Sequence, residues 1–360
     1  MPDTTKAVIA GDIHLCRQIW SNRPEITGDA YNSWRQIVKY VVDNNIGTLA
    51  LAGDIETTTK PSSEDVRVFR EGIAEVSSSG ARVVAIRGNH DWVEPPWFLA
   101  STDMVEHVNG KMFDLVDGIP FFGMDYHRGS EFPQVFDSVP KEAVGILMHN
   151  GVKEAFGIDQ GYEFTLSDVP PHIRGLFMGH IHTAWDHHSK NLIAAYTSNT
   201  YLERRGARQE TGFLVVSGEG SGAFTYNRVR LNNRIVSSFV VNRRDDVSTL
   251  VGHIDGLDIV DGLKPIVYLD YDPVEVPEDD VISAAGDKVH LFSRPFVREL
   301  KEDNTDDVLE SDSVVECLGK CIEPTSPAYE VLRGALVDGV ADKQAYFRKL
   351  RGEWGVTVGV

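Results

Sequence analysis

Short apolar runs and stretches of helical spacing alternate along the first half of the chain. Five runs rich in β-branched residues are typical of buried strands, and a glycine or a polar residue follows each. Apolar side chains recur at helical spacing over residues 30–44 and again over residues 63–77. The pattern predicts an α/β fold with helices packed against a sheet. The five runs are residues 7–10, 49–52, 83–86, 144–148 and 176–178.

The second half of the chain changes character twice. Strands predicted at 192–196, 212–217, 223–231 and 235–241 should complete a second sheet, giving a two-sheet sandwich flanked by helices. A strand at 265–271, a helix at 278–285 and a strand at 289–293 predict a small α/β domain. An acidic stretch then leads to amphipathic segments. We therefore expect four parts: a main domain (1–242), a small domain (243–298), a linker (299–313) and a C-terminal helical segment (314–360).

Residues that commonly bind metals follow each of the five runs. In an open α/β sheet, ligands bind where parallel strands end. A centre that clamps a phosphoryl group between two divalent ions needs carboxylate, imidazole and amide ligands, with one carboxylate bridging the ions. Glycines before four of these ligands let the backbone turn sharply and approach a metal closely. A single Gly-Asp pair is more often a turn, but five clusters in order favour a site. The candidate ligands are Asp12, His14, Asp54, Asn89, His149, His180 and His182.

These clusters resemble the signature of the calcineurin-like metallophosphoesterase superfamily. The stretches 53–63 and 82–91 are similar to SbcD-type DNA repair nucleases and to related recombination nucleases of tailed phages. The Asp-Arg-Gly triplet of the superfamily's protein phosphatases does not follow Asp54. The resemblance implies a two-sheet α/β sandwich with a small α/β cap domain and C-terminal helices.

The resemblance also implies a role for each site residue. It implies two divalent ions, with manganese expected first and iron, zinc or magnesium as alternatives. Asp54 would bridge them, and His90 would be a catalytic residue that stabilises the transition state or protonates the leaving oxygen. Glu56 and Thr57 depart from the family pattern, which usually has an aromatic residue and then His or Asp there. One ion would be bound by Asp12, His14, Asp54 and His182, and the other by Asp54, Asn89, His149 and His180.

Apolar stretches and cysteines indicate the cellular compartment in which the protein is expected. No apolar stretch approaches the ~20 residues of a membrane span, and the N-terminus lacks the apolar run of a signal peptide. We expect a cytoplasmic protein without membrane contact. Three cysteines, Cys16, Cys317 and Cys321, are too few for a disulfide framework. The last two could be buried residues or, less in keeping with their number, a zinc site.

The formal net charge of −19 is unusual for a DNA enzyme, because affinity for duplex DNA comes largely from Lys and Arg. Much of the acidity lies from residue 243 onward, with roughly 13 basic and 25 acidic side chains. The candidate DNA contacts are basic loop residues, which could equally be ordinary solvated charges. They are Arg17, Arg204, Arg205 and Arg208.

The resemblance therefore implies a manganese-dependent DNA nuclease subunit, acting as exonuclease or endonuclease through a two-metal-activated water. The resemblance implies DNA as a partner, an SbcC-type ATPase bound by the C-terminal helices, and a homodimer as a further state, in repair, recombination or phage DNA processing. An alternative is a phosphodiesterase or phosphatase acting on small molecules or RNA. A scaffold subunit with a vestigial site is disfavoured by the intact ligand set. The aromatic stretch 92–98 could shape the substrate site, form a dimer contact or simply pack.

Overall fold

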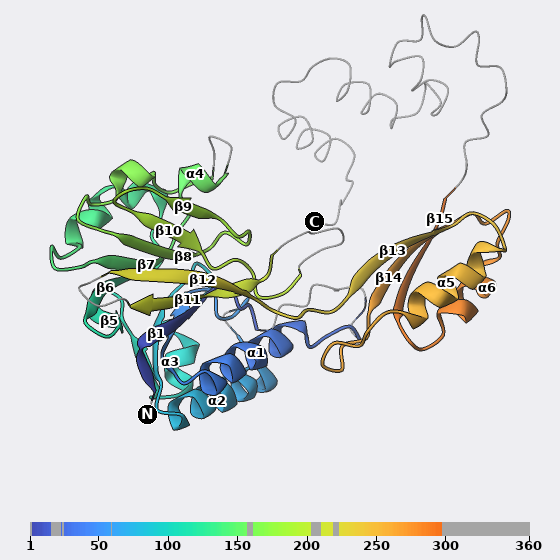
Figure 1. Ribbon diagram of the computed structural model, residues 1–360, viewed down its shortest axis with the longest axis horizontal. Coiled ribbons are helices and arrows are strands. Elements are labelled where there is room, and N and C mark those ends of the chain that lie inside the picture. The colour runs from blue at the N-terminus through green and yellow to red at the C-terminus, as the bar shows by residue number, and fades with distance from the viewer. Residues whose placement is uncertain are drawn as a thin grey trace, which may run out of the picture. The chain divides into compact units, whose positions relative to one another are not determined.

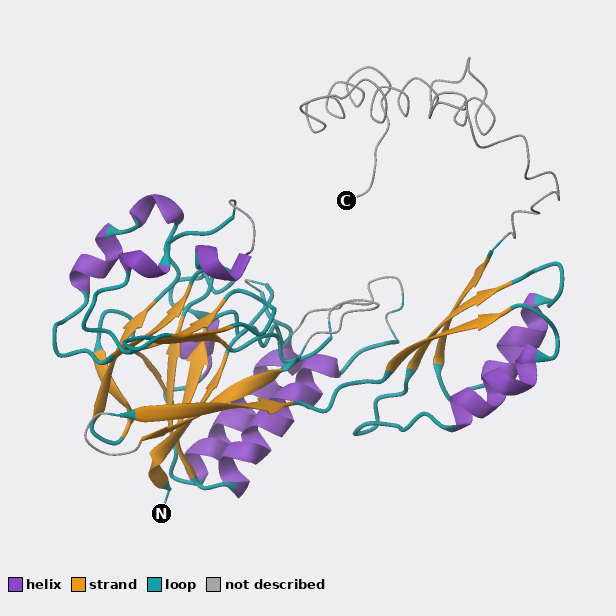
Figure 2. Cartoon of the chain, turned by 45° about the horizontal axis from the view of Figure 1, so that its top comes forward, coloured by secondary structure: helices purple, strands orange, loops and turns teal. Residues whose placement is uncertain are grey.

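The computed structural model describes residues 2–15, 23, 25–58, 60–156, 161–202, 210–218 and 223–296. Two six-stranded sheets face each other, and helices α1 and α2 lie side by side along one of them (Figure 1). A sheet of three strands follows at the end of the described chain, and Figure 2 distinguishes its strands from the helices beside it. The two-sheet α/β architecture expected from the sequence is confirmed.

The first sheet has the order β12-β11-β1-β2-β3-β4. Strands β1 to β4 are parallel, and β11 and β12 add antiparallel strands beside β1. Ala10 pairs with Leu51, and Ala52 pairs with Ile86, so the carboxyl ends of β1, β2 and β3 lie level. The bounds are β1 (Asp3–Ala10), β2 (Ile46–Ala52), β3 (Arg82–Ile86), β4 (Val105–His107), β11 (Gly212–Gly218) and β12 (Phe224–Arg230).

Helices α1 (Asp29–Asp43) and α2 (Ser63–Ser78) match their predicted ranges within one residue at each end. Ser62 begins α2 with a capping box that satisfies backbone N–H groups of the first turn. Trp34 of α1 stacks on Phe69 of α2 at 5.6 Å, and both are buried against the sheet. The short helix α3 (Trp97–Ser101) buries its two aromatic residues in the same core.

The second sheet has the order β5-β6-β7-β8-β10-β9. Strands β6, β7, β8 and β10 are parallel, and His149 pairs with Gly179 at the carboxyl ends of β7 and β8. Phe121 and Phe177 stack at 5.9 Å in a core shared with residues of the first sheet. The bounds are β5 (Met112–Val116), β6 (Ile119–Met124), β7 (Gly145–His149), β8 (Gly175–Gly179), β9 (Asp186–His188) and β10 (Ile193–Tyr196).

Short helices connect the strands of the second sheet. They cover its outer face together with Phe132 and Phe164, whose rings stack at 5.3 Å. The bounds are η1 (Gly129–Glu131), η2 (Gln134–Ser138), α4 (Lys153–Phe156) and η3 (Leu166–Asp168).

The sheet membership of the later strands differs from the prediction. Of the four strands expected to complete the second sheet, only β10 joins it. Strands β11 and β12 extend the first sheet, and the strand predicted at 235–241 joins the three-stranded sheet. Alternating apolar residues predict that a segment is a strand, but its partner depends on packing with distant residues.

The third sheet consists of parallel strands β13 (Val236–Val241), β14 (Ile266–Tyr271) and β15 (His290–Pro295). Helices α5 (Asp246–Asp255) and α6 (Glu278–Ala285) pack on one face and enclose a separate small core. The sequence predicted β14, α6 and β15 but not α5. Strand β13 pairs with β14 although it precedes the predicted boundary at residue 242.

Several sequence predictions lie outside the described residues. They concern the acidic linker (299–313), the C-terminal segment (314–360) and all three cysteines. Among the helices that the structure does describe, none is both long and apolar enough to cross a membrane.

Candidate metal centre

The carboxyl end of β7 and the loops that follow β1, β2, β3 and β8 bring the seven candidate ligands together. The backbone N–H of Asp12 donates to the carbonyl of Gly53 at 3.1 Å, which joins the first two loops. The N–H of His180 donates to the Asp12 carboxylate at 3.0 Å, which joins the first sheet to the second. Candidate ligands from separate strands thus meet at the carboxyl ends of the parallel strands of both sheets.

The first group consists of Asp12, His14, Asp54 and His182. One donor atom from each lies within 4.8 Å of the others, so the four could hold a metal ion. His14 Nε2 lies 3.3 Å from His182 Nε2 and 3.7 Å from Asp54 Oδ2. His182 Nε2 lies 3.5 Å from Asp12 Oδ1. Two imidazoles and two carboxylates are donors that suit zinc, iron or manganese.

The second group consists of Asn89, His149 and His180, with Asp54 again beside them. Asn89 Oδ1 lies 2.9 Å from His180 Nδ1 and 3.1 Å from His149 Nε2. His149 Nε2 also lies 3.3 Å from Asp54 Oδ2. The same carboxylate oxygen of Asp54 therefore borders both groups.

The hydrogen bonds of His149 show that this arrangement fits a cation. Its Nδ1 lies 2.7 Å from the carbonyl of Ala52, which can only accept, so Nδ1 carries a hydrogen. In the neutral imidazole, Nε2 is then an acceptor that faces two further acceptors, Asp54 Oδ2 and Asn89 Oδ1. Three acceptors this close repel one another unless a proton or a metal ion lies among them.

The pKa values express the same electrostatic demand. Burial raises the pKa of Asp12 to about 6. Burial alone would raise the pKa of Asp54 as well, but the imidazoles of His149 and His14 hold it below its usual range. Although burial opposes a positive charge, the Asp54 carboxylate raises the pKa of His149 to about 9. Burial and the nearby charge of His149 lower the pKa of His180 to about 3.

Four candidate ligands have left-handed backbone conformations. The φ angles are 51° at Asp12, 46° at His14, 49° at Asp54 and 99° at His180. Such conformations are uncommon for residues other than glycine, and they concentrate at functional sites. They turn each loop abruptly at the end of its strand, so that the ligand side chain points back toward the centre.

Glycines allow the loops to approach this closely. A Cβ at Gly53, where φ is +81°, would lie 2.5 Å from His149 Nδ1. A Cβ at Gly179 would lie 2.7 Å from the same nitrogen and 3.2 Å from Asp12 Oδ2. Because real Cβ contacts are longer than 3.0 Å, a side chain at either position would displace the ligands.

His90, the candidate catalytic residue, lies beside the first group. Its ring centroid is 5.2 Å from that of His14, and its backbone N–H donates to Asp54 Oδ1 at 2.9 Å. Its Nδ1 lies 3.0 Å from the carbonyl of Thr57, so Nδ1 donates. Thr57 therefore acts through its backbone, while the side chain of Glu56 is fully buried.

Glu163 is not among the candidate residues predicted from the sequence. Its Oε2 accepts the N–H of Gly151 at 2.6 Å and lies 4.0 Å from His180 Nε2. Since His180 Nδ1 faces Asn89, Glu163 borders the other ring nitrogen, the position from which a carboxylate orients a metal-binding imidazole. It follows no predicted strand and belongs to none of the clusters, so no sequence signal could have found it.

Asp91 lies two residues after the candidate ligand Asn89 and is not itself a candidate ligand. Its carboxylate accepts the N–H of Gly88 at 2.9 Å and that of Ile55 at 3.4 Å, which ties the loops after β2 and β3 together. Burial raises its pKa to about 7. The candidate DNA contacts Arg17, Arg204, Arg205 and Arg208 lie outside the described residues.

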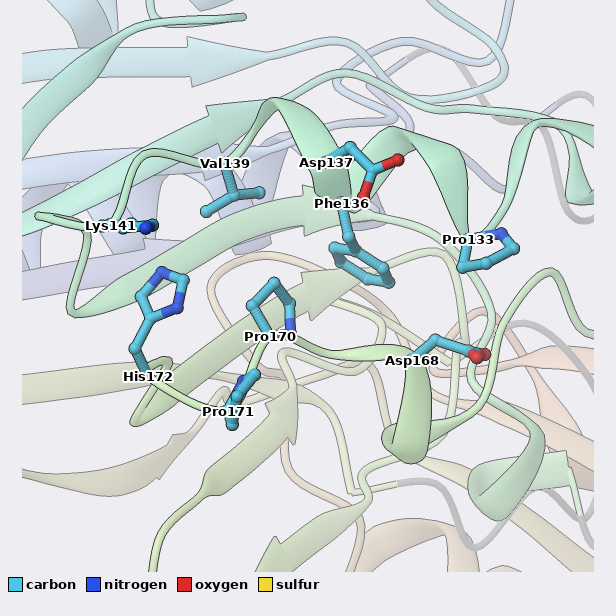
Figure 3. Close-up of a pocket in the computed structure, with 9 residues that line it drawn as sticks. All are labelled: Pro133, Phe136, Asp137, Val139, Lys141, Asp168, Pro170, Pro171 and His172. Carbon is cyan, nitrogen blue, oxygen red and sulfur yellow. The ribbon is translucent and has the colours of Figure 1, made fainter.

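A hollow of about 450 Å³ lies between the segments 133–141 and 168–172, which connect strands of the second sheet (Figure 3). Phe136, Val139 and Pro170 give it an apolar lining, and Lys141 and His172 add polar groups. None of the seven candidate ligands lines it. It is therefore separate from the candidate metal centre.

Three known proteins are similar to parts of this chain. The DNA double-strand break repair protein Mre11 of Saccharolobus solfataricus is 23% identical over 190 residues, or 48% of this chain and 48% of that protein. The chain thus spans about half the length of this relative. A solved archaeal phosphodiesterase is 12% identical, with a TM-score of 0.35 over 62% of this chain and 99% of its own. A dimetal phosphatase from Danio rerio is 11% identical, with a TM-score of 0.43 over 64% and 98%.

The family model for calcineurin-like phosphoesterases matches residues 5–254, which is more than half of the chain. The matched range contains both large sheets, apart from the first two residues of β1, and all seven candidate ligands. A candidate divalent metal site at the ends of the strands accords with a metal-dependent phosphoesterase. The chain therefore belongs to the calcineurin-like phosphoesterase family.

Proposed function

We propose that this chain is a manganese-dependent DNA nuclease that hydrolyses phosphodiester bonds, as an exonuclease or an endonuclease. The proposal depends most on Asp54, whose Oδ2 lies 3.3 Å from His149 Nε2 and 3.7 Å from His14 Nε2. A carboxylate that borders both ligand groups suits a bridge between two divalent ions. The similarity to Mre11, named as a DNA double-strand break repair protein, favours DNA over a small-molecule substrate.

The residues of the centre would divide the chemistry. Two bound ions would supply positive charge to the phosphoryl oxygens and lower the pKa of a water molecule. His90 donates through Nδ1 to the carbonyl of Thr57, so Nε2 is the nitrogen that would, in the imidazolium form, give its proton to the leaving oxygen. One ion would be held by Asp12, His14, Asp54 and His182, and the other by Asp54, Asn89, His149 and His180.

The test is degradation of end-labelled linear duplex and single-stranded DNA with manganese, beside hydrolysis of bis-p-nitrophenyl phosphate. We expect Asp54→Ala and His90→Ala to abolish both activities. The matched controls are Asp117→Ala and His188→Ala, which change exposed residues outside the centre. Hydrolysis of the small diester with both DNA substrates intact would refute the nuclease proposal and favour a small-molecule phosphodiesterase.

We also propose that an SbcC-type ATPase binds residues 314–360. The support is the amphipathic spacing of residues 314–322, 329–337 and 343–354. The full-length chain should retain the ATPase in a pull-down, and a chain shortened at residue 312 should not. Equal retention by both chains would contradict this proposal without affecting the nuclease assay.

A further inference from the structure

Trp92 is an exposed aromatic residue three positions after the candidate ligand Asn89. It is 53% exposed, and no other Phe, Trp or Tyr in the described ranges belongs to the exposed class. The neighbouring Trp97 and Phe98 are buried in the core beside α2. The indole of Trp92 therefore has no role in that core, although burying it would be favourable.

A single aromatic ring connects Trp92 to the candidate metal centre. The ring of Trp92 meets Tyr126 edge-on, with centroids 6.0 Å apart and an angle of 85° between the planes. The ring of Tyr126 lies 5.6 Å from His180 and 6.4 Å from His149. Trp92 is thus one ring away from the imidazoles that border Asn89.

Arg87 holds together the two segments that carry these rings. Its Nη1 donates to Glu94, two residues after Trp92, at 2.5 Å. Its Nε donates to Asp125, the residue before Tyr126, at 2.6 Å. The carbonyl of Arg87 accepts the N–H of Tyr126 at 2.9 Å. The two segments that carry the rings are therefore tied to each other before any substrate binds, which lowers the entropic cost of binding.

An aromatic surface next to a phosphoesterase centre suits a nucleobase. Every base has a π face that can stack on an indole, and this contact does not depend on positive charge. The chain has a formal net charge of −19, so the phosphate contacts that bind most nucleic acids are weakened here. Stacking would supply affinity that the electrostatics of this chain do not.

We propose that Trp92, supported by Tyr126, is a stacking subsite for the base of the nucleotide adjoining the scissile phosphate. This inference rests on the proposed nucleic-acid phosphodiesterase function and adds a substrate preference to it. The subsite would favour nucleotide diesters over simple alkyl diesters, with little discrimination among bases, because stacking tolerates all four.

The test compares esters that share a leaving group. The 5′- and 3′-(p-nitrophenyl phosphate) esters of thymidine carry a base, whereas methyl p-nitrophenyl phosphate does not. The measured quantity is the ratio of kcat/KM for each thymidine ester to kcat/KM for the methyl ester, with manganese. Because the nitrophenyl group is common to both, any stacking of that group cancels in the ratio.

We expect wild-type protein to prefer at least one thymidine ester. Trp92→Ala and Trp92→Leu should lower that ratio by about 5- to 150-fold, the usual range for losing one base–aromatic contact. Trp92→Phe retains an aromatic face and should keep most of the preference. Met104→Ala, which removes another exposed apolar side chain, should leave the ratio unchanged.

Other outcomes separate the two proposals. If wild-type protein shows no preference, or if Trp92→Ala lowers kcat/KM equally for all esters, the subsite is overturned while the phosphodiesterase function stands. If wild-type protein hydrolyses none of the diesters with manganese, the proposed function fails and the subsite fails with it. Thermal unfolding of each variant shows whether a loss of activity is due to misfolding. If Trp92→Ala is misfolded, the ratio of kcat/KM values measured with the other Trp92 variants, Leu and Phe, decides the question.

Discussion

Replacing Gly179 with alanine would place a methyl group inside the candidate metal centre. The added Cβ would lie 2.7 Å from His149 Nδ1 and 3.2 Å from Asp12 Oδ2, and it would overlap the carbonyl of Ala52. Two of these neighbours are candidate ligands, and the third is the backbone acceptor that fixes the His149 ring. The backbone can accommodate the methyl group only if the ends of β2, β7 and β8 move apart.

The size of the effect follows from this overlap. Overfilling a packed interior usually costs about 1–3 kcal/mol. A domain of about 150–250 residues loses roughly 2–4 °C in Tm for each kcal/mol. The activity should fall by more than the fraction of unfolded protein would explain, because a displacement of about 1 Å among catalytic groups can lower the rate ~100-fold.

Gly252→Ala is the matched control, because it adds the same methyl group elsewhere. Gly252 is exposed in α5, and no atom lies within 4 Å of its added Cβ. Alanine favours a helix over glycine by about 0.5–1 kcal/mol, so this variant should be slightly more stable. Thermal unfolding and manganese-dependent hydrolysis of bis-p-nitrophenyl phosphate measure both variants.

The two substitutions should therefore shift stability in opposite directions. If Gly179→Ala unfolds at the wild-type temperature and hydrolyses the diester at the wild-type rate, the close approach of β2, β7 and β8 is wrong. The reasoning from that approach to the metal centre would then be wrong as well.

Three further predictions test other parts of the structure. Glu163→Gln should weaken manganese binding about 10-fold in calorimetry, because the carboxylate near His180 is lost. Glu142→Gln, which changes an exposed carboxylate, should leave the affinity unchanged. Equal affinities of the two variants would count against an orienting role for Glu163. Arg234→Ala should lower the free energy of unfolding in urea by roughly 3 kcal/mol, because it leaves the partly buried Asp29 carboxylate without its partner and removes hydrogen bonds to the carbonyls of Thr27 and Lys264. An unchanged midpoint would contradict this. His149 has a pKa of 6.5 in the unfolded chain and about 9 in the folded protein. The proton that it binds therefore stabilises the fold at low pH, and this stabilisation is lost as the proton dissociates. In EDTA, the free energy of unfolding should fall as the pH rises from about 6.5 to about 9. Saturating manganese should remove this dependence, and a flat profile in EDTA would refute it.

The sequence predicted the chemistry of the centre because that chemistry depends on residue type and order. Runs such as 49–52 and 83–86 are apolar without alternation, which indicates strands buried on both faces. The observed strands end at Ala52 and Ile86, directly before the loops that carry Asp54 and Asn89. Parallel strands align these ends, so residues far apart in the sequence could be expected to meet.

Partner choice among strands could not be predicted in the same way. The alternation in β11 and β12 identifies strands but not the sheet to which they belong. Their place beside β1 depends on packing, for example that of Phe213 against Tyr40 of α1 at 5.0 Å. Such contacts join residues more than 150 positions apart, and no local pattern records them.

Residue type and order alone predicted an α/β phosphoesterase with candidate imidazole, carboxylate and amide ligands at the ends of buried strands. Strand burial and ligand type are local properties, so the amino acids specify them directly. Three relations could be seen only in the folded chain: Asp54 borders both candidate ligand groups, Glu163 lies near His180, and Trp92 is exposed next to Tyr126. These relations depend on distances between loops from different strands, which the packing of the two sheets sets.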